Sequence, residues 1–432
     1  MRIQQIHLNN IGVFEGESIE FQPCPTKGKA EIHVFTGTNG SGKSTLLYAL
    51  AAATGGVSKK AETLFCKRFR FERTKLNDKD KHSYTSYLFI KTDDSRYLNL
   101  IIGANEFGQL VHRTDSGIEK PLTNHINFTA NVNFAAFAYS GLRSAENIEI
   151  DAVRDQSKFN AFEEALDFNK TNTSYSINQW IANNISKLSL AKTNLDKKRY
   201  LDNLTLFQNT ISHIIGYNIE FALQLEPLKL VLKTENAELD FDVLPDGLRS
   251  IISWLGDLLM RMDLLQWENN LPVAERKFML LLDEIEVHLH PEWQRKILPV
   301  VQKLFPNAQI FISTHSPFVV NSVDDAWIYN LQVENGNGSV VKVALSQDGN
   351  SISRVLSEIF GVKAEFGVQV EKELAEFYTL RNAILSQNLN GATEKSFLTI
   401  ARKLAEQGDE LNNIVGLELR QISRQMQKKY EI

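Results

Sequence analysis

Eight consecutive residues near the N-terminus have the spacing of a phosphate-binding loop. They match the pattern G-x-x-x-x-G-K-[ST] and are Gly37-Thr38-Asn39-Gly40-Ser41-Gly42-Lys43-Ser44, with Thr45 directly after them. The glycines let the backbone turn tightly and aim successive N–H groups at phosphate oxygens, and a following helix adds the positive potential of its N-terminal end. Lys43 is predicted to neutralise the β- and γ-phosphates and the Ser44 hydroxyl to hold Mg²⁺. The loop therefore predicts binding of ATP with Mg²⁺.

A second element is an apolar run that ends in two carboxylates. Phe278–Leu282 is followed by Asp283 and Glu284. Asp283 suits a Mg²⁺-binding position, and Glu284 suits a general base that orients the attacking water. An apolar run before two acidic residues is common and by itself marks only a strand leaving the core. Its functional interpretation depends on the phosphate-binding loop.

A third element is a histidine at the end of the next apolar strand. Ile310–Thr314 leads directly into His315. If this strand lies beside the strand that ends at Asp283, His315 is able to reach the γ-phosphate end of the same site. A histidine at a strand end is more often structural, so this role also depends on the other two elements.

The carboxylates and histidines after residue 282 also permit a metal-cluster hypothesis. Its candidates are Asp283, Glu284, Glu286, His288 and His290. The stretch lacks H-E-x-x-H, and alternate residues of an extended segment do not close a tetrahedral shell. The alternative interpretation is a turn from His288 before a helix that begins near Pro291, a residue suited to a first helical turn.

The pattern around these elements predicts an α/β fold. Residues 1–36 alternate as short strands, residues 31–36 form a strand entering the loop, and Leu46, Leu47 and Leu50 recur at helical spacing up to Gly55-Gly56. Residues 84–140 are predicted to form an antiparallel meander. Residues 277–315 read as strand, helix and strand with continuous apolar runs, which is typical of a parallel sheet buried on both faces.

These elements divide the chain into four predicted parts. Residues 1–144 form an N-terminal ATPase lobe, and residues 145–217, rich in Asn, Lys, Glu and Leu, form a helical insertion. Residues 218–350 form a C-terminal ATPase lobe that carries Asp283, Glu284 and His315. Residues 351–432 form a helical region for oligomer or partner contact.

Composition sets limits on the class of protein. The chain has 432 residues, 43% of them hydrophobic, and a formal net charge of -5, so global charge gives no drive toward nucleic acid. Two cysteines, Cys24 and Cys66, suggest neither a disulfide framework nor a zinc site. No run approaches the roughly 20 apolar residues of a membrane span, and no signal peptide is recognisable. We expect a cytoplasmic protein without a membrane partner.

Together, the loop, the acidic strand end and the histidine resemble the ATP-binding-cassette type of ATPase, where they recur in this order. Gly37 to Thr45 resemble its Walker A loop, Phe278–Glu284 its Walker B strand, and His315 its switch histidine. The family's signature loop is best matched by Leu244-Pro245-Asp246-Gly247-Leu248-Arg249-Ser250, although Pro245 replaces a serine. The resemblance implies that Asp246, Gly247 and Arg249 act in trans on a partner's nucleotide, with dimer-dependent, slow hydrolysis. A simpler interpretation makes Asp246 the cap of the following helix.

Within this superfamily, several sequence segments indicate a narrower group. The segments GTNGSGKSTLLYAL, FAYSGLRS, DEIEVHLHPEWQ and FPNAQIFISTHSPFVV resemble the soluble group of overcoming-lysogenization-defect, RecF and SMC-like ATPases. The greatest likeness is to the PtuA family, the ATPase subunits of Septu-type antiphage systems, including retron-associated versions. This resemblance implies a homodimer or higher homo-oligomer and a separate HNH-type nuclease. In retron-associated versions it also implies a reverse transcriptase with its non-coding nucleic acid. With about 80 residues after Asn350, a fused nuclease is not expected.

Two other functions are compatible with the same elements. One is a RecF-like repair ATPase that binds DNA or RNA directly. The run Lys67–Lys75 interleaves cations with aromatic residues as nucleic-acid surfaces do, although a solvated strand edge explains it equally. The other is the cassette of a membrane transporter, against which the 240 residues between Lys43 and Asp283 count. Tyr139 and Arg143 are candidates for coupling the nucleotide to other parts.

Overall fold

The computed structural model describes residues 1–55, 86–94, 97–104, 110–114, 132–141, 152–154, 156, 159–168, 173–226, 228–347, 349–362, 364–386 and 391–431. The chain forms two compact units, Met1–Val355 and Leu356–Ile432. Each unit contains its own cluster of buried hydrophobic side chains.

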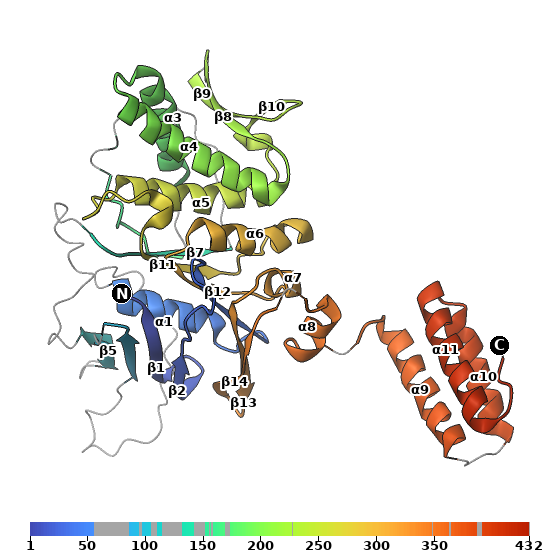
Figure 1. Ribbon diagram of the computed structural model, residues 1–432. Helices are drawn as coiled ribbons and strands as arrows, with labels where there is room; N and C mark the ends of the chain where they lie inside the picture. The colour runs from blue at the N-terminus through green and yellow to red at the C-terminus, as the bar shows by residue number, and fades with distance from the viewer. Residues whose placement is uncertain are drawn as a thin grey trace, which may run out of the picture. The chain divides into compact units, whose positions relative to one another are not determined.

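A mostly parallel six-stranded sheet forms the centre of the first unit (Figure 1). Its order is β14-β13-β3-β12-β11-β7. The strands span Asn337–Leu345, Trp327–Glu334, Glu31–Gly37, Gln309–Ser313, Phe278–Asp283 and Ala135–Ser140, respectively. All neighbouring pairs are parallel except β13 with the edge strand β14. Every residue of β7, β11 and β12 is buried, so the prediction of a parallel sheet covered on both faces is confirmed.

A second, antiparallel sheet has the order β2-β1-β4-β5-β6. These strands span Phe14–Glu20, Ile3–Ile11, Ser86–Thr92, Tyr97–Ala104 and Leu110–Thr114. The predicted meander over residues 84–140 is right for β4 to β6 and wrong for β7, which pairs in parallel with β11. The small and apolar residues Ala135–Ala138 of β7 suit a strand covered on both faces, a position that alternation alone does not distinguish from a meander strand.

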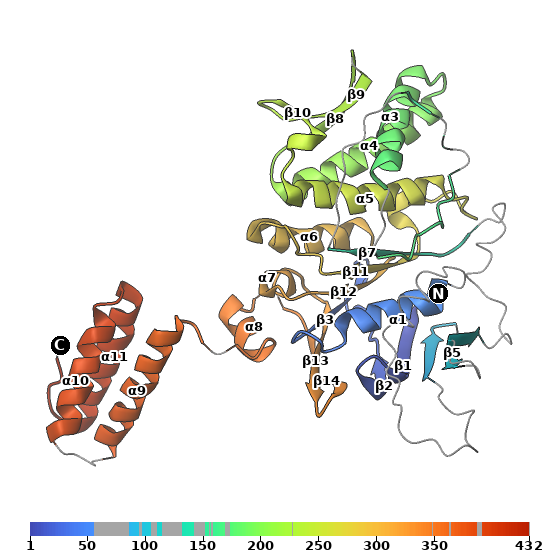
Figure 2. The same cartoon turned by 180° about the vertical axis from the view of Figure 1, so that it is seen from behind.

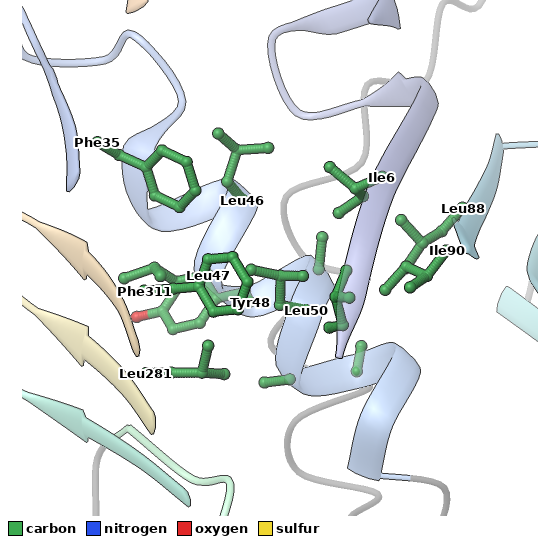
Figure 3. Close-up of a cluster of buried hydrophobic side chains, with 14 of the residues drawn as sticks. Ile6, Phe35, Leu46, Leu47, Tyr48, Leu50, Leu88, Ile90, Leu281 and Phe311 are labelled. Carbon is green, nitrogen blue, oxygen red and sulfur yellow. The ribbon is translucent and has the colours of Figure 1, made fainter. Parts of the chain in front are cut away.

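Helix α1 (Lys43–Gly55) lies between the two sheets (Figure 3). It is apolar on every side, because one side of the helix faces the parallel sheet and the other faces the antiparallel sheet. The core around it contains the helix residues Leu46, Leu47 and Leu50, with Phe35, Leu281 and Phe311 from the parallel sheet and Ile6, Leu88 and Ile90 from the antiparallel sheet. The helix that follows the phosphate-binding loop is therefore held rigidly from both sides.

Two helices cover the other face of the parallel sheet (Figures 1 and 2). They are α5 (Asp246–Leu264) and α6 (Pro291–Leu304). Helices α3 (Thr173–Leu190) and α4 (Asn194–Ile215) form a hairpin that packs on them. A small antiparallel sheet follows, with β8 (Glu220–Leu225), β9 (Leu228–Lys233) and β10 (Glu238–Asp240). Short turns of 3₁₀ helix span Phe241–Val243 and Val273–Glu275, and α7 spans Pro317–Val320.

Three helices make up most of the second unit. They are α9 (Val368–Leu385), α10 (Gly391–Ala405) and α11 (Asp409–Met426). Phe377 and Phe397 stack at a centroid distance of 5.0 Å inside this bundle. Helix α8 (Ile352–Glu358) crosses the boundary between the units. The C-terminal region is helical as predicted, whereas the division of residues 1–350 at 144 and 217 stays a prediction.

Membrane crossing finds no support in these elements. Among the helices of the described ranges, none combines the length and the apolar character that crossing a bilayer requires.

Candidate nucleotide site

The phosphate-binding loop joins β3 to α1 and depends on glycine at three positions. Gly37, Gly40 and Gly42 have φ of 140°, 79° and 100°, a region that residues with a Cβ rarely adopt. At Gly37 an added Cβ would lie 2.0 Å from the Leu331 carbonyl oxygen, and at Gly42 one would lie 2.5 Å from the Phe14 ring. The loop is thus wrapped tightly, with Lys43 as the first residue of α1. This geometry places free backbone N–H groups at a helix N-terminus, where anions bind.

The Lys43 ammonium lies within its own loop. Its Nζ donates to the carbonyl oxygens of Gly37 at 3.0 Å and Thr38 at 2.9 Å. Burial lowers the pKa of Lys43, while the charges of Asp283, Glu284 and Glu286 act in the opposite direction. A cation that is partly stripped of water gains more from a phosphate than an exposed one does.

Asp283 connects the loop to the end of the neighbouring strands. Its Oδ1 accepts a hydrogen bond from Ser44 Oγ at 3.0 Å and another from Ser313 Oγ. Asp283 pairs with Ser313 in the parallel register of β11 and β12, so both strands end at one level. A hydroxyl and a carboxylate oxygen are hard ligands of the kind that Mg²⁺ prefers, with phosphate oxygens completing the shell. The residues present therefore fit the predicted metal.

Glu284 follows in a strained conformation. Its φ is 54°, which is uncommon for a residue other than glycine. Its backbone N–H donates to the Ser313 carbonyl at 3.1 Å and to Ser313 Oγ at 3.0 Å, so the turn is fixed by β12. The Glu284 side chain remains partly exposed at this edge of the sheet, next to the strand end that carries Asp283.

His315 lies in the loop after β12. Its backbone N–H donates to Glu286 Oε1 at 2.6 Å. Burial and the charge of Lys43 lower the pKa of the His315 imidazole, against the opposite effect of Asp283. The neutral imidazole is the form able to donate at one nitrogen and accept at the other. The structure therefore brings Lys43, Ser44, Asp283, Glu284 and His315 to the same end of the sheet.

The signature-like residues lie in the first turn of α5. Gly247 packs against the chain's own loop after β11, since an added Cβ would meet the His288 carbonyl oxygen at 2.6 Å. The prediction that Asp246 caps this helix is wrong. Pro245 occupies the cap position without a side-chain bond, and Asp246 is helical and accepts from Arg249 three residues later.

The metal-cluster hypothesis is not supported. The described residues, which include all of 283–290, contain no group of three or more His, Cys, Asp or Glu able to hold a metal ion. His290 Nδ1 instead accepts from Glu292 N at 3.3 Å and caps α6, which begins at Pro291 as predicted.

The remaining candidates have separate outcomes. Tyr139 donates to Asp257 Oδ2 of α5 at 2.8 Å, so it connects β7 to that helix. Arg143, Cys66 and the run Lys67–Lys75 lie outside the described residues.

Two residues of this site were not predicted. Ser313 was read only as part of a strand, and Glu286 only as part of the rejected metal cluster. The lengths of the two predicted strands indicate that Ser313 lies near Asp283. Two adjacent parallel strands that end at the same level place their last residues side by side. Glu286 had no such signal, since its contact with His315 is a loop-to-loop bond.

Comparison with protein-family models gives one match. Residues 32–321 match the family described as "AAA domain, putative AbiEii toxin, Type IV TA system". The matched range includes the phosphate-binding loop, α5, the Asp283 strand and His315, and it spans about two thirds of the chain.

The chain belongs to this family. Its fold is the α/β P-loop type that the resemblance implied, with an N-terminal antiparallel sheet and a helical C-terminal unit.

Curated relatives include retron ATPases and Septu proteins. The Retron Ec83 probable ATPase of Escherichia coli is 23% identical over 84% of this chain and 76% of its own length. A Septu protein PtuA of Bacillus thuringiensis is 24% identical over 38% of this chain and 43% of its own length. The Retron Vc95 probable ATPase of Vibrio cholerae is 26% identical over 40% and 35%. The expected resemblance to PtuA and retron ATPases is confirmed. The matches to the last two proteins span less than half of those proteins.

Solved structures include SMC head domains. The head domain from Thermotoga maritima covers 80% of this chain with a TM-score of 0.42 and 14% identity. An SMC head bound to the C-terminal winged-helix domain of ScpA gives a TM-score of 0.46 at 12% identity.

Proposed function

We propose that this chain is an ATP-binding and slowly hydrolysing regulatory subunit of an antiphage defence complex, acting in the cytoplasm. One observation carries the ATPase part. Ser44 of the phosphate-binding loop donates to Asp283 at the end of β11, 239 residues away in the sequence. A serine and an aspartate in this relation are able to share one Mg²⁺ between the loop and the strand.

Each residue of the site has a role that follows from its place. The loop N–H groups and Lys43 bind the phosphates, and Ser44 and Asp283 hold Mg²⁺. When bound, Mg²⁺ neutralises charge on the β- and γ-phosphates. Glu284 accepts the proton of the attacking water, and His315, neutral at pH 7, orients the γ-phosphate. Slow turnover fits a regulator, whose bound state must persist long enough to control a partner.

The direct test compares three variants in ATP binding and phosphate release. Lys43→Ala should lose ATP binding at concentrations that saturate the wild type, because the buried cation for the phosphates is gone. Glu284→Gln should bind ATP and release little phosphate. Lys303→Ala, an exposed lysine on α6, is the matched control and should resemble the wild type. Full hydrolysis by Lys43→Ala would refute the assignment.

Dimer dependence is the second part of the proposal. Arg249 lies in the first turn of α5, partly exposed, and among the described residues its side chain pairs with Asp246. We propose that this turn completes the nucleotide site of a second copy. Lys43→Ala and Arg249→Ala subunits, each inactive, should then regain part of the ATPase activity when mixed. Arg249 is preferable to Gly247 for this test, because a side chain at Gly247 would disturb its own chain. No recovery at any ratio would exclude action in trans.

The partner is proposed from the relatives. They are named as retron ATPases and as Septu PtuA, so we propose a separate HNH-type nuclease and, in a retron, a reverse transcriptase with its nucleic acid. The second unit has its own core and is the proposed contact. Deleting residues after 365 should preserve ATP binding and abolish nuclease pull-down. If the truncated protein still pulls down the nuclease, the contact lies in the first unit.

Direct nucleic-acid binding is a second candidate that one observation favours. The end of α3, the turn after it and the start of α4 carry exposed cations, namely Lys187, Lys192, Lys197, Lys198 and Arg199. Arg199 is paired with Asp263. Duplex binding by the isolated protein with ATP should then weaken steeply with salt and be reduced by Lys197→Glu with Lys198→Glu. Unchanged binding in that double variant would remove this role from the turn.

A further inference from the structure

The loop after β11 makes contacts with three separate parts of the first unit. At Gly141, after β7, an added Cβ would lie 2.2 Å from the Glu284 carbonyl oxygen, and at Gly247 one would lie 2.6 Å from that of His288. Glu286, between these two positions, accepts the His315 backbone N–H at 2.6 Å. The loop, which begins at the proposed water-activating residue Glu284, therefore lies in direct contact with the end of β7, the switch histidine and the signature-like turn.

Glu286 is the only residue of this loop whose side chain is recorded bonding the backbone of His315 within the described structure. The neighbouring residues of the His315 loop are fixed independently. Thr314 N donates to the Phe35 carbonyl at 3.1 Å, and Ser316 Oγ donates to Gln294 Oε1 at 2.5 Å while capping α7. His315 thus lies between two anchored residues, and its own peptide is held by the Glu286 carboxylate.

We propose that Glu286 is a positioning residue for ATP hydrolysis, whose carboxylate oxygen sets the orientation of the His315 peptide and so of the imidazole toward the γ-phosphate. This inference rests on the proposed ATPase function and adds to it a residue outside the Walker B pair. Among the described residues, Glu286 makes no hydrogen bond to Lys43 or Ser44, and its charge acts on Lys43 only at a distance. Its direct contact with the site is the bond to His315.

The stability of the fold does not by itself explain why a carboxylate stands at position 286. Its second oxygen, Oε2, is buried and has no hydrogen-bond partner among the described residues. A buried polar atom without a partner lowers the stability of the folded protein. Burial also raises the pKa of Glu286, ahead of the opposite effects of the His315 N–H, the Glu286 N–H and the Thr314 hydroxyl. Apolar replacements at buried charged positions are often neutral or stabilising. A partly buried carboxylate beside a proposed catalytic loop is better explained by the bond that it makes to His315 there.

The test uses the full chain and five variants. Glu286→Ala removes the acceptor, and Glu286→Gln keeps an oxygen that is able to accept the same N–H. A third variant is His315→Ala, and a fourth combines it with Glu286→Ala. Comparing these two shows whether the effect of Glu286→Ala on kcat requires the His315 side chain. Glu292→Ala, which removes an exposed carboxylate of α6 that accepts from Lys296, is the matched control. Each protein is measured for ATP dissociation constant, kcat and thermal midpoint.

A positioning role for Glu286 predicts a distinct pattern of results. Glu286→Ala should lower kcat at least about fivefold, the scale of an unpaired buried N–H, with ATP affinity and thermal midpoint near those of the wild type. Glu286→Gln should recover most of kcat, and the double variant should be no slower than His315→Ala alone.

Three outcomes would overturn the inference. Wild-type kcat in Glu286→Ala would show that the bond is irrelevant, and Gln as slow as Ala would show that charge matters rather than the acceptor. A further loss in the double variant would show that Glu286 acts independently of His315. Failure of the proposed function is distinguishable from all three, because the wild type itself would then neither bind nor hydrolyse ATP.

Discussion

Gly247 offers a test of whether the first turn of α5 supports the nucleotide site of its own chain. In Gly247→Ala, the new Cβ would lie 2.6 Å from the His288 carbonyl oxygen and 3.2 Å from the Trp293 ring. An ordinary contact begins at about 3.4 Å, so backbone must move by about 0.8 Å. Overpacking of this kind costs about 1–3 kcal/mol of stability.

The displaced segment carries Glu284 and Glu286, so turnover should suffer as well as stability. A shift near 1 Å in a catalytic group costs about a hundredfold in rate, and sharing the shift between α5 and the loop reduces this to roughly tenfold. ATP affinity should change little, because the phosphate-binding loop is held by α1 and the two sheets instead.

Gly256 in the same helix provides the matched control. A Cβ there would meet Ile177 at 2.9 Å and Phe207 at 3.0 Å, which are side-chain atoms of the α3–α4 hairpin. Gly256→Ala should therefore also lower stability, measured by urea unfolding, and leave kcat per folded molecule unchanged. Equal kcat losses in the two variants, or none in Gly247→Ala, would refute a specific role for the Gly247 contact.

Three further predictions concern other parts of the first unit. Glu284→Gln should trap ATP, so that bound ATP is recovered unhydrolysed after gel filtration, whereas recovery of ADP would place the base elsewhere. Ser313→Ala removes one of two hydroxyl donors to Asp283 and should raise the Mg²⁺ concentration for half-maximal activity about tenfold, with Ser313→Thr less affected. His33 is buried against Glu31, and burial lowers the pKa of His33 below its ordinary value. The unfolded chain therefore takes up a proton first, so stability is complete above about pH 6.5 and falls below it; urea unfolding at pH 7.5 and 5.5 should show this loss in the wild type and less of it in His33→Gln.

Local sequence predicts those parts of the molecule that short-range physics controls. The loop from Gly37 to Ser44 requires glycine at positive φ at three places, and all three glycines lie within eight adjacent residues. The β11 and β12 strands are continuous apolar runs, so their burial in a parallel sheet is readable. The proximity of Ser44 to Asp283 is a consequence of placing both strand ends at one edge. Their roles in catalysis stay predictions until the variants are measured.

Other features depend on contacts that no local pattern encodes. β7 is apolar and follows the meander strands directly, and its parallel pairing with β11 is what assigns it to the other sheet. Asp246 has the residue type of a helix cap, but Pro245 occupies that position and the Asp246 carboxylate bonds Arg249 instead. Glu286 reaches His315 across 29 residues, a distance at which spacing gives no information.

Helix α5 is fixed at two places with different chemistry, one on the loop after β11 and one on β7. At its first turn, Gly247 lies against the His288 carbonyl, a steric contact that backbone on both sides makes costly to change. In its middle, Asp257 accepts from Tyr139 of β7 at 2.8 Å and from Arg261 at 2.7 Å, all of them buried. The contact with β7 is the Tyr139 bond, and a hydrogen bond to a charged group contributes about 1.5–3 kcal/mol. A helix held by both contacts cannot rotate on the sheet without losing one of them, so any displacement of the loop after β11 is transmitted to α5 as a whole and not absorbed within its first turn.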